Sequence, residues 1–325
     1  YALLLGVFML LGVSFFGTAK AAGTTYYVDP SIADTNVGSA TPDCTNYNPT
    51  TFACSGGTAS AYKTIADINA KLFAEGDRIL FKAGSTFTGT IIPTKSGTST
   101  NRITYGSFGS GAKPIITGLS TVSGWTEVNK EGVVTPGTKI WRSNDITTLG
   151  TVNMILINGV NTAYGRTPNT GYWTAASATA TSITDGTRLN ASTTNWTGAN
   201  VAIRTAAWHL DRTTVTSASG STINFSQPDY KPEAQNGYFF QNHPYTLDLQ
   251  NEWSSVPGSK KVTIYSASAP TNVKVPTIEY GADLNGKNYI TFDGLNFQGF
   301  NSHGVYVNGS TGVTVQNSDF SFIAD

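Results

Sequence analysis

The residues best suited to acid–base chemistry in this 325-residue chain lie within its last fifty positions. They are Asp293, His303 and Asp319, with Asp283 and Asp325 close by in the sequence. A carboxylate or imidazole on a turn or loop can accept or donate a proton, so we predict that Asp293, His303 and Asp319 are catalytic. Two alternatives stay open. Asp293 precedes Gly294 and could cap a turn, and Asp319 could equally be a turn residue.

A second set of side chains suits ligand binding. Arg166, Trp208, His209 and Asn296 are the predicted substrate-binding residues, with Asp211, His243 and Tyr245 nearby in sequence. Aromatic faces stack on flat ligands, and arginine pairs with carboxylates. Strand alternation would place Trp208 with Leu210 on one face and His209 with Asp211 on the other. Trp208 could therefore be a core residue instead.

An internal repeat indicates how these residues are positioned. The segment 287–323 matches itself at an offset of 23, which places Thr291 on Thr314, Asn296 on Asp319 and Phe297 on Phe320. Short strands that recur at a fixed period of about 20–25 residues are typical of a solenoid, in which stacked coils share one core. A pair of β-hairpins in a sandwich is the alternative.

A second self-match lies upstream, at an offset of 24. It places Arg78 on Arg102, Ile79 on Ile103 and Phe81 on Tyr105, and it places residues 91–92 on residues 115–116. Two matches of nearly equal period predict an all-β protein whose fold is a right-handed parallel β-helix. Equivalent positions on neighbouring coils would then lie ~4.8 Å apart.

The predicted helix begins at Thr64, with Asp67 three residues later as in a capping box. Ile65, Ile68, Leu72 and Phe73 form its apolar face, and Gly76 ends it. Such a helix, just before the first repeat, would cap the exposed end of a solenoid.

Four regions follow from these patterns. Residues 1–22 read as a signal peptide with a mostly apolar run before Ala19, Lys20 and Ala21; an uncleaved anchor is the alternative. Residues 24–118 form the cap and first coils, residues 119–275 a β-rich insertion with all six Trp, and residues 276–325 the resumed solenoid. We expect further coils beyond Asp325.

Export would place the protein outside the cell or in the periplasm of a bacterium. Cys44 and Cys54, the only cysteines, are then predicted to form a disulfide, and no metal site is predicted. The formal net charge is zero, and charged residues make up 12% of the chain, which argues against nucleic acid and anionic membrane partners. The oligomeric state is not predicted.

Several segments together resemble a known family. They read TYYVDP (25–30), AYKTIADIN (61–69), EGDRILFKAGSTFTGTI (75–91) and RITYGSFGSGAKPIITG (102–118). This block resembles secreted bacterial parallel β-helix proteins of the pectate-lyase-like superfamily. The segments INGVNTAYGRTPNTGYW (157–173), NEW (251–253), VTIYSA (262–267) and YITFDGLNFQG (289–299) are similar to members that carry a β-rich insertion.

The resemblance covers nearly all of the chain after the signal peptide, and it is specific for fold rather than reaction. It implies a polysaccharide lyase or a glycoside hydrolase that acts on a polysaccharide or oligosaccharide. A hydrolase needs two carboxylates about 5.5 Å or about 6.5–9.5 Å apart, whereas a lyase needs a base and a cation, with Ca²⁺ as a possible cofactor. The catalytic residues of such enzymes usually lie on central coils, so none is transferred to this chain. A non-catalytic, glycan-binding or adhesive β-helix is the alternative, and a phage tailspike is a weaker one.

Overall fold

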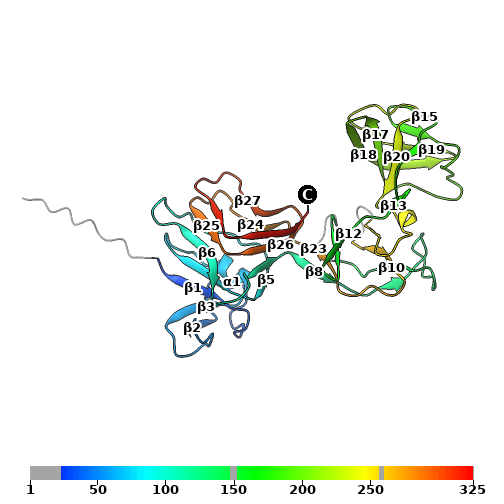
Figure 1. Cartoon of the computed structure of the whole chain (residues 1–325). Coiled ribbons are helices and arrows are strands. Elements are labelled where there is room, and N and C mark those ends of the chain that lie inside the picture. Colours follow the sequence, from blue (N-terminus) through cyan, green and yellow to red (C-terminus); the bar gives the residue numbers. More distant parts are fainter. Residues whose placement is uncertain (1–22, 147–151, 256–259, 325) are drawn as a thin grey trace, which may run out of the picture.

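The computed structural model describes residues 23–146, 152–255 and 260–324. Among these residues the chain is almost entirely β-structure, with one short α-helix, α1 (Ile65–Ala70), and one 3₁₀ turn, η1 (Pro244–Thr246) (Figure 1). The predicted all-β class is therefore confirmed. The predicted signal peptide, residues 1–22, lies outside the described part of the chain. No helix in the described ranges is long and apolar enough to cross a membrane.

The first body is built from parallel sheets formed by residues before and after the long middle region. Its largest sheet has the order β2 (Cys44–Tyr47), β3 (Ala59–Tyr62), β1 (Thr25–Val28), β4 (Arg78–Lys82), β6 (Ile103–Phe108), β25 (Ile290–Asp293) and β28 (Thr314–Gln316). All neighbours pair in parallel except β2 and β3. The strands β6 and β25 are thus direct neighbours, although the whole middle region separates them in sequence.

Two further parallel sheets complete this body. One has the order β29 (Asp319–Ile323), β26 (Asn296–Phe300), β7 (Ile115–Thr117) and β5 (Thr86–Thr88), and the other pairs β24 (Tyr280–Asp283) with β27 (His303–Tyr306). One apolar core lies between the sheets; its largest side chains include Phe81, Tyr105, Phe292, Phe297 and Phe300.

The register at the downstream repeat is the predicted one. Thr291 pairs with Thr314, Asn296 with Asp319 and Phe297 with Phe320. The same offset holds for both strands because the distance in sequence from the first strand to the second is the same in the two copies. The ring of Phe297 stacks on that of Phe320 at a centroid distance of 5.3 Å.

The predicted upstream register is wrong. Arg78 pairs with Thr104 rather than Arg102, and Ile79 pairs with Tyr105 rather than Ile103. The pairing is shifted by two positions from the predicted one, and a shift of two keeps every side chain on the same face of its strand. Residue 91 does not pair with residue 115 either: Ile91 bridges to Ala282, and Ile115 pairs with Thr86.

The helix starts where predicted and ends earlier. The Thr64 hydroxyl accepts the Asp67 N–H, and the Asp67 carboxylate accepts the Thr64 N–H, so the capping box is complete. The helix ends at Ala70, however, and Lys71 is already extended. Leu72 therefore leaves the predicted apolar face and is 77% exposed, whereas Phe73 is buried against Tyr26.

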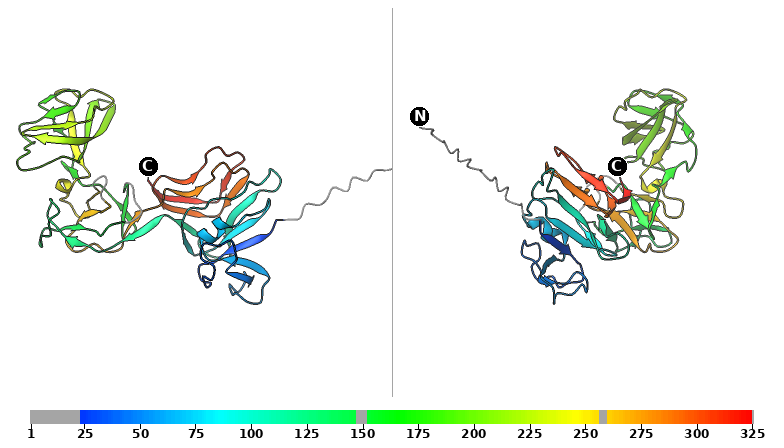
Figure 2. Two further views of the ribbon diagram at one scale, coloured as in Figure 1. Left: turned by 180° about the vertical axis from the view of Figure 1, so that it is seen from behind. Right: turned by 60° about the vertical axis from the view of Figure 1, so that its left-hand side comes forward.

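The strands from β8 (Leu119–Val122) to β23 (Val273–Pro276) build a second body of three sheets, joined to the first through these two strands (Figures 1 and 2). The sheet at this connection also contains β11 (Ile155–Ile157) and β12 (Val160–Thr162). A second sheet comprises β21 (Trp253–Ser254), β22 (Thr263–Tyr265), β10 (Ile140–Arg142) and β9 (Thr126–Glu127).

The third sheet of this body forms a separate distal lobe. Its order is β13 (Arg166–Thr167), β20 (Gly237–Gln241), β17 (Asn200–Ala206), β18 (His209–Ser219), β19 (Thr222–Phe225), β16 (Ser182–Thr184) and β15 (Ser177–Ala178), and β14 (Trp173–Thr174) also pairs with β20. These strands are antiparallel and enclose their own core, which includes Trp196, Tyr238 and Phe240. Trp196 and Phe240 stack at 4.0 Å.

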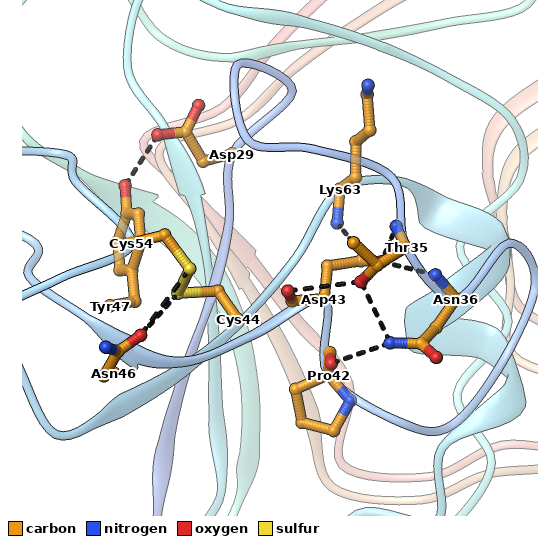
Figure 3. Close-up of a disulfide and its surroundings, with 10 residues drawn as sticks. All are labelled: Asp29, Thr35, Asn36, Pro42, Asp43, Cys44, Asn46, Tyr47, Cys54 and Lys63. Atoms are coloured by element: carbon orange, nitrogen blue, oxygen red, sulfur yellow. Dashed lines mark hydrogen bonds between the residues drawn. A yellow bond between two sulfur atoms is a disulfide. The ribbon is translucent and has the colours of Figure 1, made fainter.

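The N-terminal block is fixed by covalent and polar links (Figure 3). Cys44 and Cys54 form a disulfide. Nearby, the buried carboxylate of Asp29 accepts hydrogen bonds from the hydroxyls of Ser31 and Tyr47 and forms an ion pair of 3.0 Å with Lys82. Burial raises the pKa of Asp29, but these hydrogen bonds together outweigh it and leave the pKa below its usual range.

Because of the Asp29 carboxylate, we expect the folded protein to lose stability in acid. Because its pKa is lower in the folded than in the unfolded chain, its stabilisation is complete above the unfolded value of about 3.9 and is lost as the pH falls through the folded value. We expect urea unfolding of the wild type to show a falling free energy of unfolding below about pH 5. Asp29→Asn should flatten that dependence. The exposed Asp145 is the matched control, and an equally flat profile for Asp145→Asn would contradict the assignment.

Candidate functional site

The distal lobe presents a polar hairpin made by β17 and β18. Its register shifts between Ile203 and Ala206, so the strand pairing ends with Ala206 opposite His209. Ala207 and Trp208 form the turn between them. The Trp208 side chain is 82% exposed. It is therefore not a core residue, and an aromatic ring of this size stands open to solvent on a rigid support.

The support is the buried carboxylate of Asp211. Its Oδ2 accepts the Thr205 hydroxyl at 2.6 Å and the Tyr230 N–H at 3.4 Å, and its Oδ1 lies 3.1 Å from His209 Nε2 and accepts the Asp229 N–H at 3.2 Å. Burial raises the pKa of Asp211, yet the hydrogen bonds from Thr205 and His209 outweigh it and lower the pKa. This network ties the hairpin turn to the 229–230 segment.

His209 completes this arrangement. Its ring lies 4.6 Å from that of Tyr230, which is 48% exposed. Of the two adjacent predicted substrate-binding residues Trp208 and His209, His209 thus lies beside the exposed Tyr230. The sequence did not single out Tyr230, because the 225–235 segment has no periodic pattern that would place it beside the hairpin.

Two acidic clusters bring possible metal ligands within 4.8 Å of one another: His209, Asp211 and Asp229, and Asp34, Asp43 and Asp67. In the first, both oxygens of Asp211 already accept two hydrogen bonds each, so a cation would have to displace them. In the second, Asp43 and Asp67 accept backbone N–H groups of Thr35, Gly38 and Thr64 and order their loops. Neither set fits Ca²⁺ well, and we derive no step through a metal.

Arg166 lies on β13, at the edge of the same sheet and away from the hairpin turn in sequence. Its guanidinium carbon is 3.9 Å from the centroid of the Phe239 ring, and it donates to the carbonyl oxygens of Pro168 and Gly171. These contacts fix the loop between β13 and β14. The guanidinium also lies 5.9 Å from the centroid of the Tyr172 ring.

A hollow of about 300 Å³ opens beside Tyr172, lined by Arg204, Ala206, Ala207, Asn236 and Gly237 among others. Its lining reaches Ala207, the residue before Trp208. Arg204 was missed at the sequence level. Alternation along β17 could have found it, since Val201 and Ile203 are buried and Arg204 follows on the opposite face.

The three predicted catalytic residues lie on three different strands of the first body. Asp293 ends β25 and accepts the side-chain amides of Gln316 at 3.1 Å and Asn317 at 2.8 Å. Asp319 begins β29 and forms an exposed ion pair of 2.8 Å with Lys113. His303 begins β27 beside Ser302, with its ring 5.7 Å from that of Tyr280. Within the described ranges no hydrogen bond or ion pair joins any two of the three, and their catalytic role stays a prediction.

Asn296 lies on β26, directly opposite Asp319 on the neighbouring strand β29. It pairs with Asp319 on one side and Ile115 on the other, and its Oδ1 is buried without a hydrogen-bond partner among the described residues. A hollow of about 540 Å³ lies nearby at the end of the core, lined by His303, Gln316, Asn317 and the apolar Val315 and Phe320. Its walls are mainly side chains of β27, β28 and β29, the last strands of the three parallel sheets.

His243 serves the structure of the second body. Its Nδ1 accepts the Tyr245 N–H at the start of η1, and burial lowers the pKa of His243 to about 4. Tyr245 in turn donates its hydroxyl to Glu131, from the segment that follows β9. His243 therefore orders η1, and Tyr245 links η1 to the neighbouring sheet; both lie apart from Trp208 in sequence and bonding.

Comparison with known proteins gives a likeness in fold. No protein-family profile matches the sequence, and no curated protein matches it. A solved structure described as a glycoside hydrolase superposes with a TM-score of 0.58 at 14% identity, covering 86% of this chain and 51% of that one. A structure titled "The complex structure of XylC with xylose" has a TM-score of 0.43 at 14% identity, covering 85% of this chain and 35% of that one. The chain thus spans about half the length of the glycoside hydrolase whose fold it shares.

Proposed function

We propose that this chain is part of a secreted carbohydrate-active protein that binds a polysaccharide at the β17–β18 hairpin of its distal lobe. One observation carries the proposal: Trp208, 82% exposed, stands on a turn held rigid by the buried Asp211 network. Exposing a tryptophan forfeits the free energy of burying a large apolar surface, about 25 cal/mol per Å². A rigid, exposed ring that offers one apolar face suits stacking on the apolar face of a sugar.

The scaffold is consistent with this proposal. We propose that the first body is a right-handed parallel β-helix of the pectate-lyase-like kind, with residues 119–275 inserted between its coils. Support comes from the parallel pairing of β6 with β25 and from the repeated register of β25 with β28 and of β26 with β29. The likeness in fold to a glycoside hydrolase points the same way.

The central prediction concerns Trp208. We expect Trp208→Ala to weaken binding to the preferred polysaccharide at least tenfold, which is about 1.4 kcal/mol, because tryptophan anchors dominate such contacts. Affinity electrophoresis against a polysaccharide panel, followed by calorimetry with the best ligand, measures this loss. Val160, 64% exposed on a different sheet, provides the control Val160→Ala, which should bind like the wild type. Unchanged binding by Trp208→Ala, or no binding by the wild type to any glycan, would overturn the proposal.

For the reaction, we propose glycosidic hydrolysis or β-elimination, with Asp293, His303 and Asp319 as the candidate residues in this chain. Elimination releases an unsaturated uronate with a characteristic ultraviolet absorbance, whereas hydrolysis releases reducing ends without it. If the protein releases neither product from any glycan that it binds, that result favours the second candidate function, a non-catalytic glycan-binding protein. The polar ladder of Asp293 with Gln316 and Asn317 suits that alternative, since these contacts resemble turn stabilisation.

A further inference from the structure

The hollow beside Tyr172 has a shape that follows from one glycine. Gly237 of β20 pairs directly with Arg204 of β17, so the position opposite Arg204 carries no side chain. A Cβ on Gly237 would lie 3.0 Å from the Cβ and Cγ of Tyr172. Glycine therefore lets the Tyr172 ring lie close to the sheet and leaves an open space of about 300 Å³ next to the arginine. That space is of the size of a single sugar ring.

Both ends of this lobe pocket are held in place. Tyr172, 44% exposed, packs its ring edge-on to Phe239 at 5.6 Å, and the Arg166 guanidinium lies 5.9 Å from its centroid. Arg204 is exposed, and one of its terminal nitrogens donates to the Ala207 carbonyl at 2.9 Å. That bond turns the guanidinium along the hairpin towards Trp208.

The charge on this face is positive. Arg204 and Arg166 both lie beside Tyr172, whereas the carboxylate of Asp211 belongs to the opposite face, because it is cross-strand to Ile203 and bonds to Thr205. The acidic residue nearest in sequence is Glu233, whose N–H donates to Asn236 Oδ1 at the pocket rim. A guanidinium presents its donors in a planar fork that matches a carboxylate.

We infer that the lobe pocket binds a uronic acid residue of the polysaccharide, with Arg204 pairing to the sugar carboxylate and Tyr172 forming the wall beside the ring. This inference rests on the proposed function, since Trp208 would hold the neighbouring sugar. Arg166 contributes positive charge from behind Tyr172, and the amide side chain of Asn236 offers hydrogen bonds to hydroxyls.

The test compares glycans with and without a carboxylate. Three pairs of probes test the carboxylate: cello-oligosaccharides and their C6-oxidised counterparts, polygalacturonate and its carboxyl-reduced form, and xylan and glucuronoxylan. A fourth pair, dextran and dextran sulfate, tests whether a sulfate group binds equally well. We expect the wild type to bind the carboxylated member of at least one pair tenfold or more tightly. Arg204→Gln should reduce that preference to less than twofold by weakening binding of the carboxylated member. Arg212→Gln, an exposed arginine on β18 outside the pocket lining, should keep the full preference.

The possible failures are distinguishable. Equal wild-type binding to both members of every pair overturns the uronate assignment and leaves the proposed function standing, as does a preference that survives Arg204→Gln. If dextran sulfate binds more tightly than dextran by the same factor as the carboxylated glycans bind over their neutral partners, the carboxylate assignment is overturned in favour of a general oxyanion site. No wild-type binding to any probe or to the wider panel removes the proposed function and the inference together. Circular dichroism and melting curves of Arg204→Gln exclude misfolding as the cause of a lost preference.

Discussion

Replacing Asp211 with alanine is expected to destabilise the distal lobe by about 3–5 kcal/mol, because it removes the acceptor that several hydrogen-bond donors share. The variant leaves the Thr205 hydroxyl, His209 and the N–H groups of Asp229 and Tyr230 without their shared acceptor. Each buried donor left unpaired costs about 1–3 kcal/mol. Water can reach part of the site, because His209 keeps 33% of its side chain exposed, so the loss should fall near the lower end.

The same variant should also weaken glycan binding although Asp211 lies beneath the surface. The carboxylate fixes the residues on both sides of the turn that carries Trp208, so without it the turn becomes mobile and binding must order it first. Thermal unfolding followed by tryptophan fluorescence measures the stability, and calorimetry measures the binding. Asp229→Asn is the matched control: its side chain is exposed, and its hydrogen bond to Asp211 comes from the backbone N–H, which the variant keeps, so the stability should change by less than about 0.5 kcal/mol. Equal losses in both variants would contradict the assigned role.

The sequence predicted the parts of the fold in which local lengths repeat. The downstream self-match holds in the structure because paired positions keep one spacing in sequence through both strands, as Thr291 opposite Thr314 and Asn296 opposite Asp319 illustrate. The upstream match failed because Ile79 can pair with Ile103 or with Tyr105, and in either register the same face of the strand points into the core. Alternation fixes which face a residue takes, but registers that differ by two positions remain equivalent until loops and neighbouring strands choose between them.

The candidate site was predicted in part, for a related reason. Trp208 and His209 were identified by residue type, but strand alternation would have placed Trp208 on a strand face. The register shift between Ile203 and Ala206 instead leaves Trp208 in the turn. A bulge of this kind depends on the partner strand and gives no signal in a single sequence. Arg204 and Gly237 meet through the pairing of β17 with β20, which are separated in sequence by β18, β19 and their loops. Tyr172 reaches them through the pairing of β14 with β20.

Phe297→Ala is expected to give the largest loss of stability in the first body, about 3–5 kcal/mol. Phe297 is fully buried, and its ring contacts those of Phe292 at 5.8 Å and Phe320 at 5.3 Å. The chain cannot easily close the cavity, because Gly281 and Gly304 hold the facing sheet at close range: an added Cβ on Gly281 would lie 2.6 Å from the Phe297 ring. Urea unfolding measured by circular dichroism gives the change in free energy.

Phe320→Ala is the matched control, since it removes the same ring from the same stack. Phe320 is 47% exposed at the end hollow, so truncating it deletes less buried surface and creates no closed cavity. Its loss should be less than half that of Phe297→Ala, because the destabilisation scales with the buried area and the cavity left behind. Equal losses would mean that Phe320 is covered in solution. The pair of variants therefore measures the packing of the core and, independently, whether the apolar end formed by β27, β28 and β29 meets water or a further layer of protein.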